Sequence, residues 1–224
     1  MGTRNLTMVI SGGKTRIAQY GQWDGYPSGQ GATVLAFLKS KKNNLDGFRA
    51  KLERIRFIDD AKNKEIKEFL SSMGSTDGWM NDKQADAYHA KYPYLTRDHG
   101  AKILELVDKS EDEIIWLHDE AGFAADSLFC EWAYVVDLDK MKLEVYKGFN
   151  KKPLGVRARF KYLEEKMRDR EDKYYPIVKT ATFDINNLPE TEAEFEAKCY
   201  HKKLKVKAEK SGDVIVTAFA GKIE

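Results

Sequence analysis

The chain has 224 residues, of which 42% are hydrophobic and 33% charged, and its formal net charge is only +2. This length suffices for one domain with a full core, and the near-neutral charge argues against a protein that binds nucleic acid through a strongly basic surface. The two cysteines, Cys130 and Cys199, are too few for a disulfide framework and lack metal-ligand spacing, which predicts a reducing, cytoplasmic setting. No apolar run reaches the ~18 residues that span a bilayer, and the N-terminus lacks a secretory pattern.

The first elements in chain order are two strands, Asn5–Ser11 and Lys14–Gly21. Both are β-type runs, and Gly12 and Gly13 between them accept the positive φ that a tight hairpin turn needs. A turn at 27–29 follows, and then a series of short helical patterns. We expect helices at residues 31–40, 44–58, 63–73, 75–93 (after an initial loop) and 96–108. Thr96 or Asp98 would cap the last of these.

The pattern of the second half of the sequence predicts strands and two helices. We expect strands at residues 113–119, 128–138, 141–149, 174–185 and 213–219, and helices at 157–172 and 188–203. Pro189 and acids in the first turn suit the start of the last helix. This order predicts an α+β fold with mainly antiparallel sheets and helices packed outside them. Residues 1–150 would form the core domain, and residues 151–224 would complete the same domain.

Charge is unevenly distributed along the chain. Residues 101–150 hold twelve acidic and five basic side chains, whereas the flanking segments are net basic. Such patches suit contact with a partner protein, because complementary charge speeds and orients association. The basic runs at 39–42 and 199–210 contain few aromatic residues. A solvated lysine-rich face therefore explains them as well as phosphate contact does, and we expect no nucleic-acid partner.

Residues 19–31 hold the densest collection of binding groups. Trp23 and the tyrosines offer π faces, Gln22 and Asp24 offer hydrogen bonds, and four glycines would let a ligand approach backbone amides. The alternative is a structural corner in which Trp23 and Tyr26 pack inward and Asp24 caps the turn. Neither the phosphate-binding loop nor the dinucleotide-binding glycine pattern is present.

Other polar groups also allow two interpretations. Acidic residues between 108 and 139 could bind a divalent cation or act as acids and bases, or they could form a solvated loop. The side chains concerned are His118, Asp119, Glu120, Asp126 and Glu131. Cys130 could be a nucleophile or a core thiol, and no histidine is locally placed to activate it. His99 could line a site beside Gly100 or lie at the surface. We expect no metal and no cofactor.

The opening MGTR, together with AQYGQWDGYPSGQG at residues 18–31, resembles a family of largely uncharacterised proteins of phages, prophages and bacteria. RDHGAKILEL and LFCEWAYVVDLDKMKLEVYKGFN are similar to later blocks of that family, so the resemblance covers about the first 150 residues. It implies an accessory protein that acts by binding, foremost a counter-defence inhibitor such as an anti-CRISPR protein, or a ligand-sequestering protein. The implied partner is a host protein or a small polar ligand in the host cytoplasm.

The order of hairpin, helices and a second antiparallel sheet is also similar to the N-terminal-nucleophile (Ntn) hydrolases, which form a four-layer α-β-β-α sandwich. In those enzymes the first residue of the mature chain is Cys, Ser or Thr, and its own amine serves as base. Thr3 would qualify as the nucleophile of an amidohydrolase only if both Met1 and Gly2 were removed. With Gly2 in first place, the scaffold is catalytically incomplete.

On either reading, the site would join the start of the first strand to the turn that follows the hairpin. The binding residues would be Arg4, Asn5, Gln22, Trp23, Asp24 and Tyr26. Arg4 could hold a carboxylate or phosphate through two parallel hydrogen bonds, or it could pair with Asp24 and pin the terminus.

Overall fold

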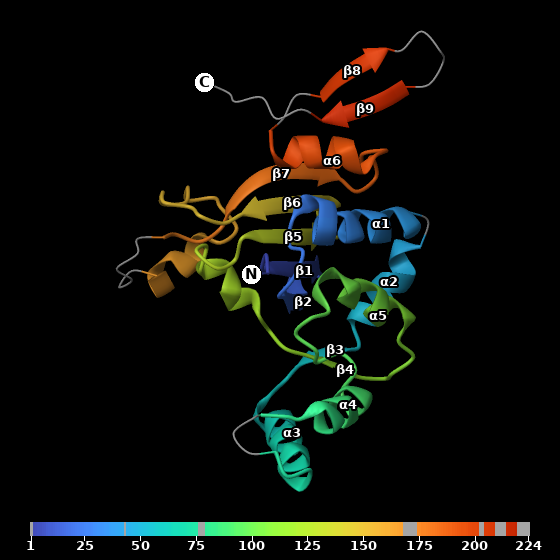
Figure 1. The fold of residues 1–224 in the computed structure, drawn as a ribbon, viewed down its shortest axis with the longest axis vertical. Helices are drawn as coiled ribbons and strands as arrows, with labels where there is room; N and C mark the ends of the chain where they lie inside the picture. The colour runs from blue at the N-terminus through green and yellow to red at the C-terminus, as the bar shows by residue number, and fades with distance from the viewer. Residues whose placement is uncertain are drawn as a thin grey trace.

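The computed structural model describes residues 2–42, 44–75, 79–167 and 174–201, and the backbone of the strands Leu204–Ala208 and Val214–Ala218. Its centre is a five-stranded mixed sheet in the order β2-β1-β5-β6-β7 (Figure 1). These strands are β1 Asn5–Ser11, β2 Lys14–Gly21, β5 Trp132–Asp137, β6 Lys142–Lys147 and β7 Val178–Asp184. Only the β1–β5 pair of this sheet is parallel. The α+β class is confirmed.

The predicted N-terminal hairpin is confirmed with its turn. Asn5 pairs with Gly21 and Ser11 with Lys14, and Gly12 and Gly13 have φ values of 63° and 69°. Both glycine amides donate 2.8 Å hydrogen bonds to the carboxylate of Asp139, in the turn between β5 and β6. The hairpin tip is therefore tied to the neighbouring hairpin of the sheet.

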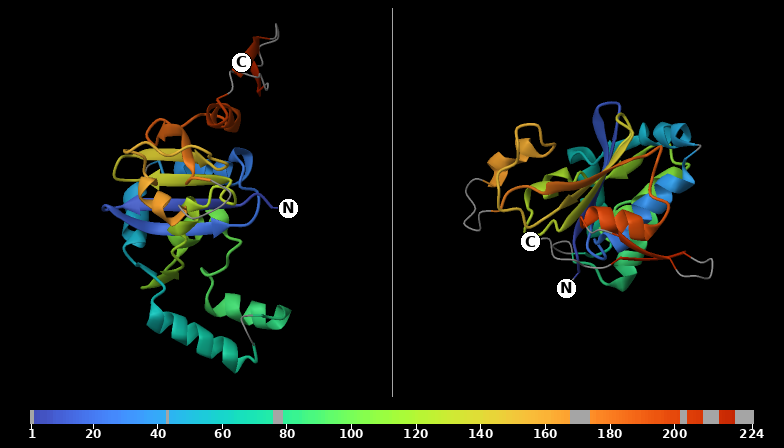
Figure 2. Two further views of the ribbon diagram at one scale, coloured as in Figure 1. Left: turned by 90° about the vertical axis from the view of Figure 1, so that its left-hand side faces the viewer. Right: turned by 90° about the horizontal axis from the view of Figure 1, so that it is seen from above.

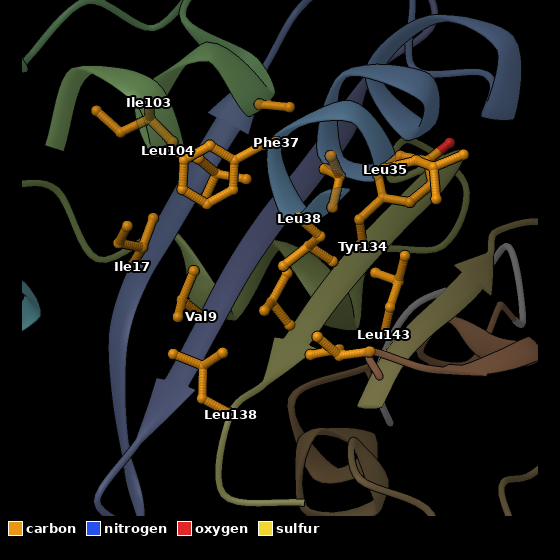
Figure 3. Close-up of a cluster of buried hydrophobic side chains, with 14 of the residues drawn as sticks. Val9, Ile17, Leu35, Phe37, Leu38, Ile103, Leu104, Tyr134, Leu138 and Leu143 are labelled. Carbon is orange, nitrogen blue, oxygen red and sulfur yellow. The ribbon is translucent and has the colours of Figure 1, made fainter. Parts of the chain in front are cut away.

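Helices cover one face of the sheet. They are α1 Ala32–Ser40, α2 Leu45–Leu52, α5 Ile103–Lys109 and α6 Glu192–Cys199, with the 3-10 turn η2 Gly100–Lys102 before α5. Leu35 and Leu38 of α1 pack at helical spacing against strand side chains such as Val9 and Tyr134 (Figure 3). α6 and β7 share this core, so part of the segment after residue 150 is built into it.

The other face is covered by two 3-10 segments, η3 Ala121–Ala125 and η4 Lys161–Met167. Because side chains alternate along a strand, Leu6 and Met8 of β1 face this layer, whereas Val9 faces the helices. Phe160, just before η4, is buried in this second core. The sheet is thus buried on both faces.

A small lobe with its own core projects from the body (Figures 1 and 2). It consists of α3 Asp60–Ser72 and α4 Asp82–Lys91, whose buried side chains include Ile66 and Tyr88. Two short parallel strands, β3 Ile55–Phe57 and β4 Ile115–Leu117, connect this α3–α4 lobe to the body.

Several expectations differ from the structure. The expected helix at 44–58 ends at Leu52, because Ile55–Phe57 pairs with β4. Neither Thr96 nor Asp98 caps α5, which continues from η2 and has no side-chain cap. The expected helix at 157–172 is the shorter 3-10 segment η4, and its last residues lie outside the described part. A strand that we did not expect, β8 Leu204–Ala208, pairs with the expected β9 Val214–Ala218.

The two stacked sheets of an Ntn-type sandwich are not found in the described ranges. These ranges contain one five-stranded sheet and two pairs of short strands, β3–β4 and β8–β9. Helices and 3-10 segments occupy both faces of the large sheet, where a second sheet would have to pack. No helix in this part of the chain has the length and apolar character that a membrane span requires.

Candidate binding site at one end of the sheet

The predicted site residues gather at one end of the five-stranded sheet. Gly21, Asn5, Trp132 and Lys147 pair in a single row across four strands. The segments 2–4, 22–26, 126–131 and 148–150, which flank these residues, therefore share one end, here named the Trp23 end. All six predicted binding residues lie there: Arg4, Asn5, Gln22, Trp23, Asp24 and Tyr26.

The backbone of the 22–31 turn is held by buried side chains. Asn5, which is fully buried, donates through Nδ2 to the carbonyls of Gly21 (3.1 Å) and Trp23 (3.2 Å). The hydroxyl of Tyr134 donates to the carbonyl of Gly25 (2.8 Å), and the amide of Gly25 donates to the carbonyl of Thr3 (2.9 Å). Asn5 is thus a positioning residue, which fixes the turn from beneath.

Asp24 has a left-handed backbone with a φ of 53°, which aspartate tolerates better than most residues. Its carbonyl accepts the amide of Gln30 at 2.8 Å. Gly29 lies so close that a Cβ there would be 2.2 Å from this carbonyl oxygen. The sequence Asp24 to Gly29 therefore forms one tight unit, which continues as the π-helical turn Pro27–Gly31 into α1.

Aromatic side chains at the Trp23 end face solvent. Trp23 is 53% and Tyr26 is 49% exposed, so the expected alternative in which both pack inward is wrong. Phe129 and Phe149 are also exposed at this end, by 38% and 50%. Exposed aromatic side chains on a fixed backbone offer contact area at a small cost in conformational entropy.

Cations stack on aromatic rings at the same end. The guanidinium of Arg4 lies 4.5 Å from the ring centre of Phe129, and Lys147 lies 5.6 Å from that of Trp132. The alternative in which Arg4 pairs with Asp24 is not found among the ion pairs of the described residues. The amide of Arg4 instead donates to Glu131 (3.3 Å), and its buried Nε has no partner.

Gln22 takes part in an internal cluster. Its Oε1 accepts hydrogen bonds from the hydroxyl of Tyr20 (2.5 Å) and from Arg97 (2.7 Å). Arg97 also stacks on the Tyr20 ring, at 5.0 Å from its centre. The amide oxygen of Gln22 is therefore occupied, and Arg97 is a contributor that the sequence alone did not indicate.

Beneath the turn lies a polar floor on the helix-facing side of β1 and β2, formed by Asn5, Thr7 and Gln19. All three are buried, and Gln19 donates to the carbonyls of Tyr20 and Thr96. Oδ1 of Asn5 and Oγ1 of Thr7 have no hydrogen-bond partner. The alternation of polar residues along β1, followed by Val9 on the same face, is the sequence signal that could have revealed this floor.

A groove of about 670 Å³ opens beside Trp23, over the outward face of α1. Trp23, Asp24, Asp98, Lys102 and Glu192 border it. A second hollow of about 440 Å³ continues along α1 toward Ser40, and both are lined by Thr33, Ala36 and Lys102. The groove is thus a continuation of the Trp23 end.

The candidate nucleophiles are buried. Thr3 is only 6% exposed, and a Cβ at Gly2 would lie 2.4 Å from both the Gln22 carbonyl and the Trp23 ring. Cys130 is fully buried, and burial raises the pKa of its thiol well above the ordinary value, which fits a core thiol. Nε2 of His99 donates a 2.7 Å hydrogen bond to the carbonyl of Pro93.

No group of three or more His, Cys, Asp or Glu side chains that could hold a metal ion occurs within the described part of the chain. Of the acidic candidates, Asp119 accepts the amide of Ala121 (3.0 Å) and Glu131 accepts that of Arg4. The contact of Asp119 is local to its turn, whereas that of Glu131 ties the start of β5 to the start of β1.

The Trp23 end combines two structural features. Exposed aromatic rings and stacked cations are fixed on a backbone that buried side chains hold in place. Comparison with protein-family models, with curated proteins and with solved structures finds no match to this chain.

Proposed function

We propose that this chain is a phage- or prophage-type accessory protein that binds a host protein through the Trp23 end and acts as a counter-defence inhibitor. The observation that carries the binding proposal is the exposure of Trp23, Tyr26, Phe129 and Phe149 at one end of one sheet. The counter-defence role rests on the family resemblance of the first 150 residues.

A protein partner fits this surface better than other classes of partner. Residues that dominate binding energy in protein interfaces are enriched in Trp, Tyr and Arg, which is the composition found here. The charge at this end is mixed, because it holds the acids Asp24 and Glu131 as well as the bases Arg4 and Lys147. A nucleic-acid site would instead need a predominantly basic surface.

The turn is held in place before any partner binds. Asn5 and Tyr134 fix its backbone from below, so little ordering entropy remains to be lost when Trp23 and Tyr26 are covered. Such preorganisation favours tight association for a given contact area.

Site-specific photo-crosslinking tests the proposal. A photoreactive phenylalanine analogue replaces Tyr26 in one variant and Val156, which is 87% exposed, in the control. In host cells with an active defence system, Tyr26 should crosslink one host protein that Val156 does not. Trp23→Ala/Tyr26→Ala should abolish protection of a sensitive phage, measured as plating efficiency. Protection that persists in this double variant would contradict the proposal.

The alternative, an amidohydrolase that uses Thr3, makes a different prediction. It requires a mature chain that starts at Thr3, although Thr3 is buried and Gly2 packs against Trp23. Intact mass of the purified protein separates the two functions, because a chain that retains Gly2 has no N-terminal threonine amine to act as base.

A further inference from the structure

The groove over α1 is an unpartnered helix face with a floor of small side chains. Thr33 and Ala36 line both of its hollows, and Ala36 is exposed. From Ser28 to Ser40 the floor runs for about 18 Å at 1.5 Å per helical residue. That length matches about five residues of extended chain.

Charge at the Trp23 half of this groove is negative. Asp24, Asp98 and Glu192 border it, against the single cation Lys102. None of these four side chains belongs to an ion pair within the described residues. At the far half, by contrast, Lys41 pairs with Asp108 and Lys109 with Glu105, at 2.5 Å each.

We propose that the groove along α1 holds an extended basic segment of the partner protein, with an arginine or lysine side chain of that segment over the exposed face of Trp23. This proposal rests on the proposed function and names the chemistry of its partner. Three carboxylates that form no ion pair with another described residue complement a positive segment, and a tryptophan face attracts a cation. The small floor allows the backbone of the segment to approach α1.

The probe is a fluorescein-labelled Arg-Gly-Arg-Gly-Arg peptide, with Glu-Gly-Glu-Gly-Glu as its charge-reversed control. We expect saturable anisotropy changes with the arginine peptide alone, and about tenfold weaker binding in Asp98→Asn/Glu192→Gln. The matched control Glu68→Gln/Asp86→Asn removes two acids of the α3–α4 lobe and should bind as the unaltered protein does.

Two further variants act in opposite directions on the same groove. Ala36→Lys places a cation on its floor and should weaken peptide binding, whereas Ala36→Glu should strengthen it. Ala36 is an exposed helical position, so both variants should fold, which circular dichroism verifies. Lys102→Gln, which removes the cation of the groove, should also strengthen binding.

Equal affinities of the two Ala36 variants, binding of both peptides, or no binding at low salt would overturn the proposal. Displacement of the peptide by equimolar spermine would also overturn it, since the groove would then recognise any small polycation. Crosslinking at Tyr26 that survives Ala36→Lys would show that the Trp23 end binds a partner without the groove. Crosslinking at Tyr26 that is lost in Trp23→Ala but survives in Ala36→Lys would overturn the groove proposal and leave the proposed function intact.

Discussion

The two faces of the central sheet bury polar groups in different ways. On the helix-facing side, Asn5, Thr7 and Gln19 are neutral, and two of their polar atoms lack hydrogen-bond partners. On the opposite side, Asp137 and Glu144 are charged and buried, and both bind Arg159 at 2.6 and 2.7 Å.

Neighbouring side chains supply further hydrogen bonds and ion pairs to the charged cluster. Glu144 also accepts hydrogen bonds from Lys179 of β7 (3.0 Å) and from Tyr146 of β6 (2.7 Å). Lys140 lies 3.6 Å from Asp137. Arg159 belongs to the segment that leads into η4, so the cluster attaches this covering layer to the sheet.

The comparison of these two clusters teaches that the charged cluster is fully paired, whereas the neutral cluster beneath the turn leaves two polar atoms without partners. A buried charge is tolerated only when it is paired, because its desolvation costs several kcal/mol. A buried neutral polar group without a hydrogen-bond partner destabilises the protein less, by about 1–3 kcal/mol. Four predictions probe this difference, from the largest expected effect to the smallest.

Arg159→Met should destabilise the protein by about 3 kcal/mol, because Asp137 and Glu144 would stay buried without their shared cation. Urea unfolding gives the free-energy change. Lys142→Met is the matched control, since its ion pair with Asp184 (2.7 Å) is partly exposed to solvent and should contribute little to stability. Equal losses in the two variants would contradict the difference between buried and exposed pairs.

The same cluster should make stability depend on acid pH. Burial alone would raise the pKa of Glu144 and of Asp137, but hydrogen bonds from Tyr146, Arg159 and Lys179 hold that of Glu144 below its ordinary value, and Arg159 holds that of Asp137 low as well. Their contribution is complete above the ordinary carboxyl pKa and is lost as pH falls through the lowered values. The thermal midpoint of unfolding should therefore decrease as the pH is lowered below ~4.5.

The control for this pH dependence is again Arg159→Met, whose profile should be flatter in the acid range because its carboxyl pKa values are no longer lowered. A profile as steep as that of the unaltered protein would assign the acid sensitivity to other carboxylates.

Tyr134→Phe should destabilise the protein by about 1–2 kcal/mol, because the buried carbonyl of Gly25 loses its donor. The packing of the ring in the core is kept. Amide hydrogen exchange should rise in residues 22–31 more than in β6. A uniform rise across the sheet would mean that Tyr134 supports the core without specifically holding the turn.

Thr7→Val should change stability by less than about 1 kcal/mol, and can increase it, because the buried Oγ1 has no partner to lose. Asn5→Ala is the contrasting variant, since it removes two donated hydrogen bonds and should cost more. A large loss in Thr7→Val would show that its hydroxyl has a bound water as partner.

Local signals predicted much of the fold. Gly12 and Gly13 between two β-type runs identified the hairpin, and the apolar spacing of residues 31–40 identified α1. Local sequence patterns failed where pairing with a distant strand decides the conformation. Ile55–Phe57 is an example, because it is a strand only through its pairing with β4.

The candidate site was found in the same uneven way. The composition of residues 19–31 indicated the turn, but the direction in which Trp23 and Tyr26 point depends on Asn5 and Tyr134 beneath it. Arg4 lies on Phe129 and away from Asp24, and Arg97 joins Gln22, because segments far apart in the chain meet at one end of the sheet. Contacts between distant segments leave no pattern in the local sequence.

The position of β1 has a consequence for the order of folding. This strand is synthesised well before β5 but lies inside the sheet, between β2 and the parallel strand β5, whose first residue is Trp132. During translation the hairpin can close early, yet one edge of β1 keeps unpaired backbone groups until residue 137 has left the ribosome. Such non-local parallel pairing slows folding and leaves an open strand edge to which other chains can add. Nascent-chain solubility should therefore improve once β5 has emerged.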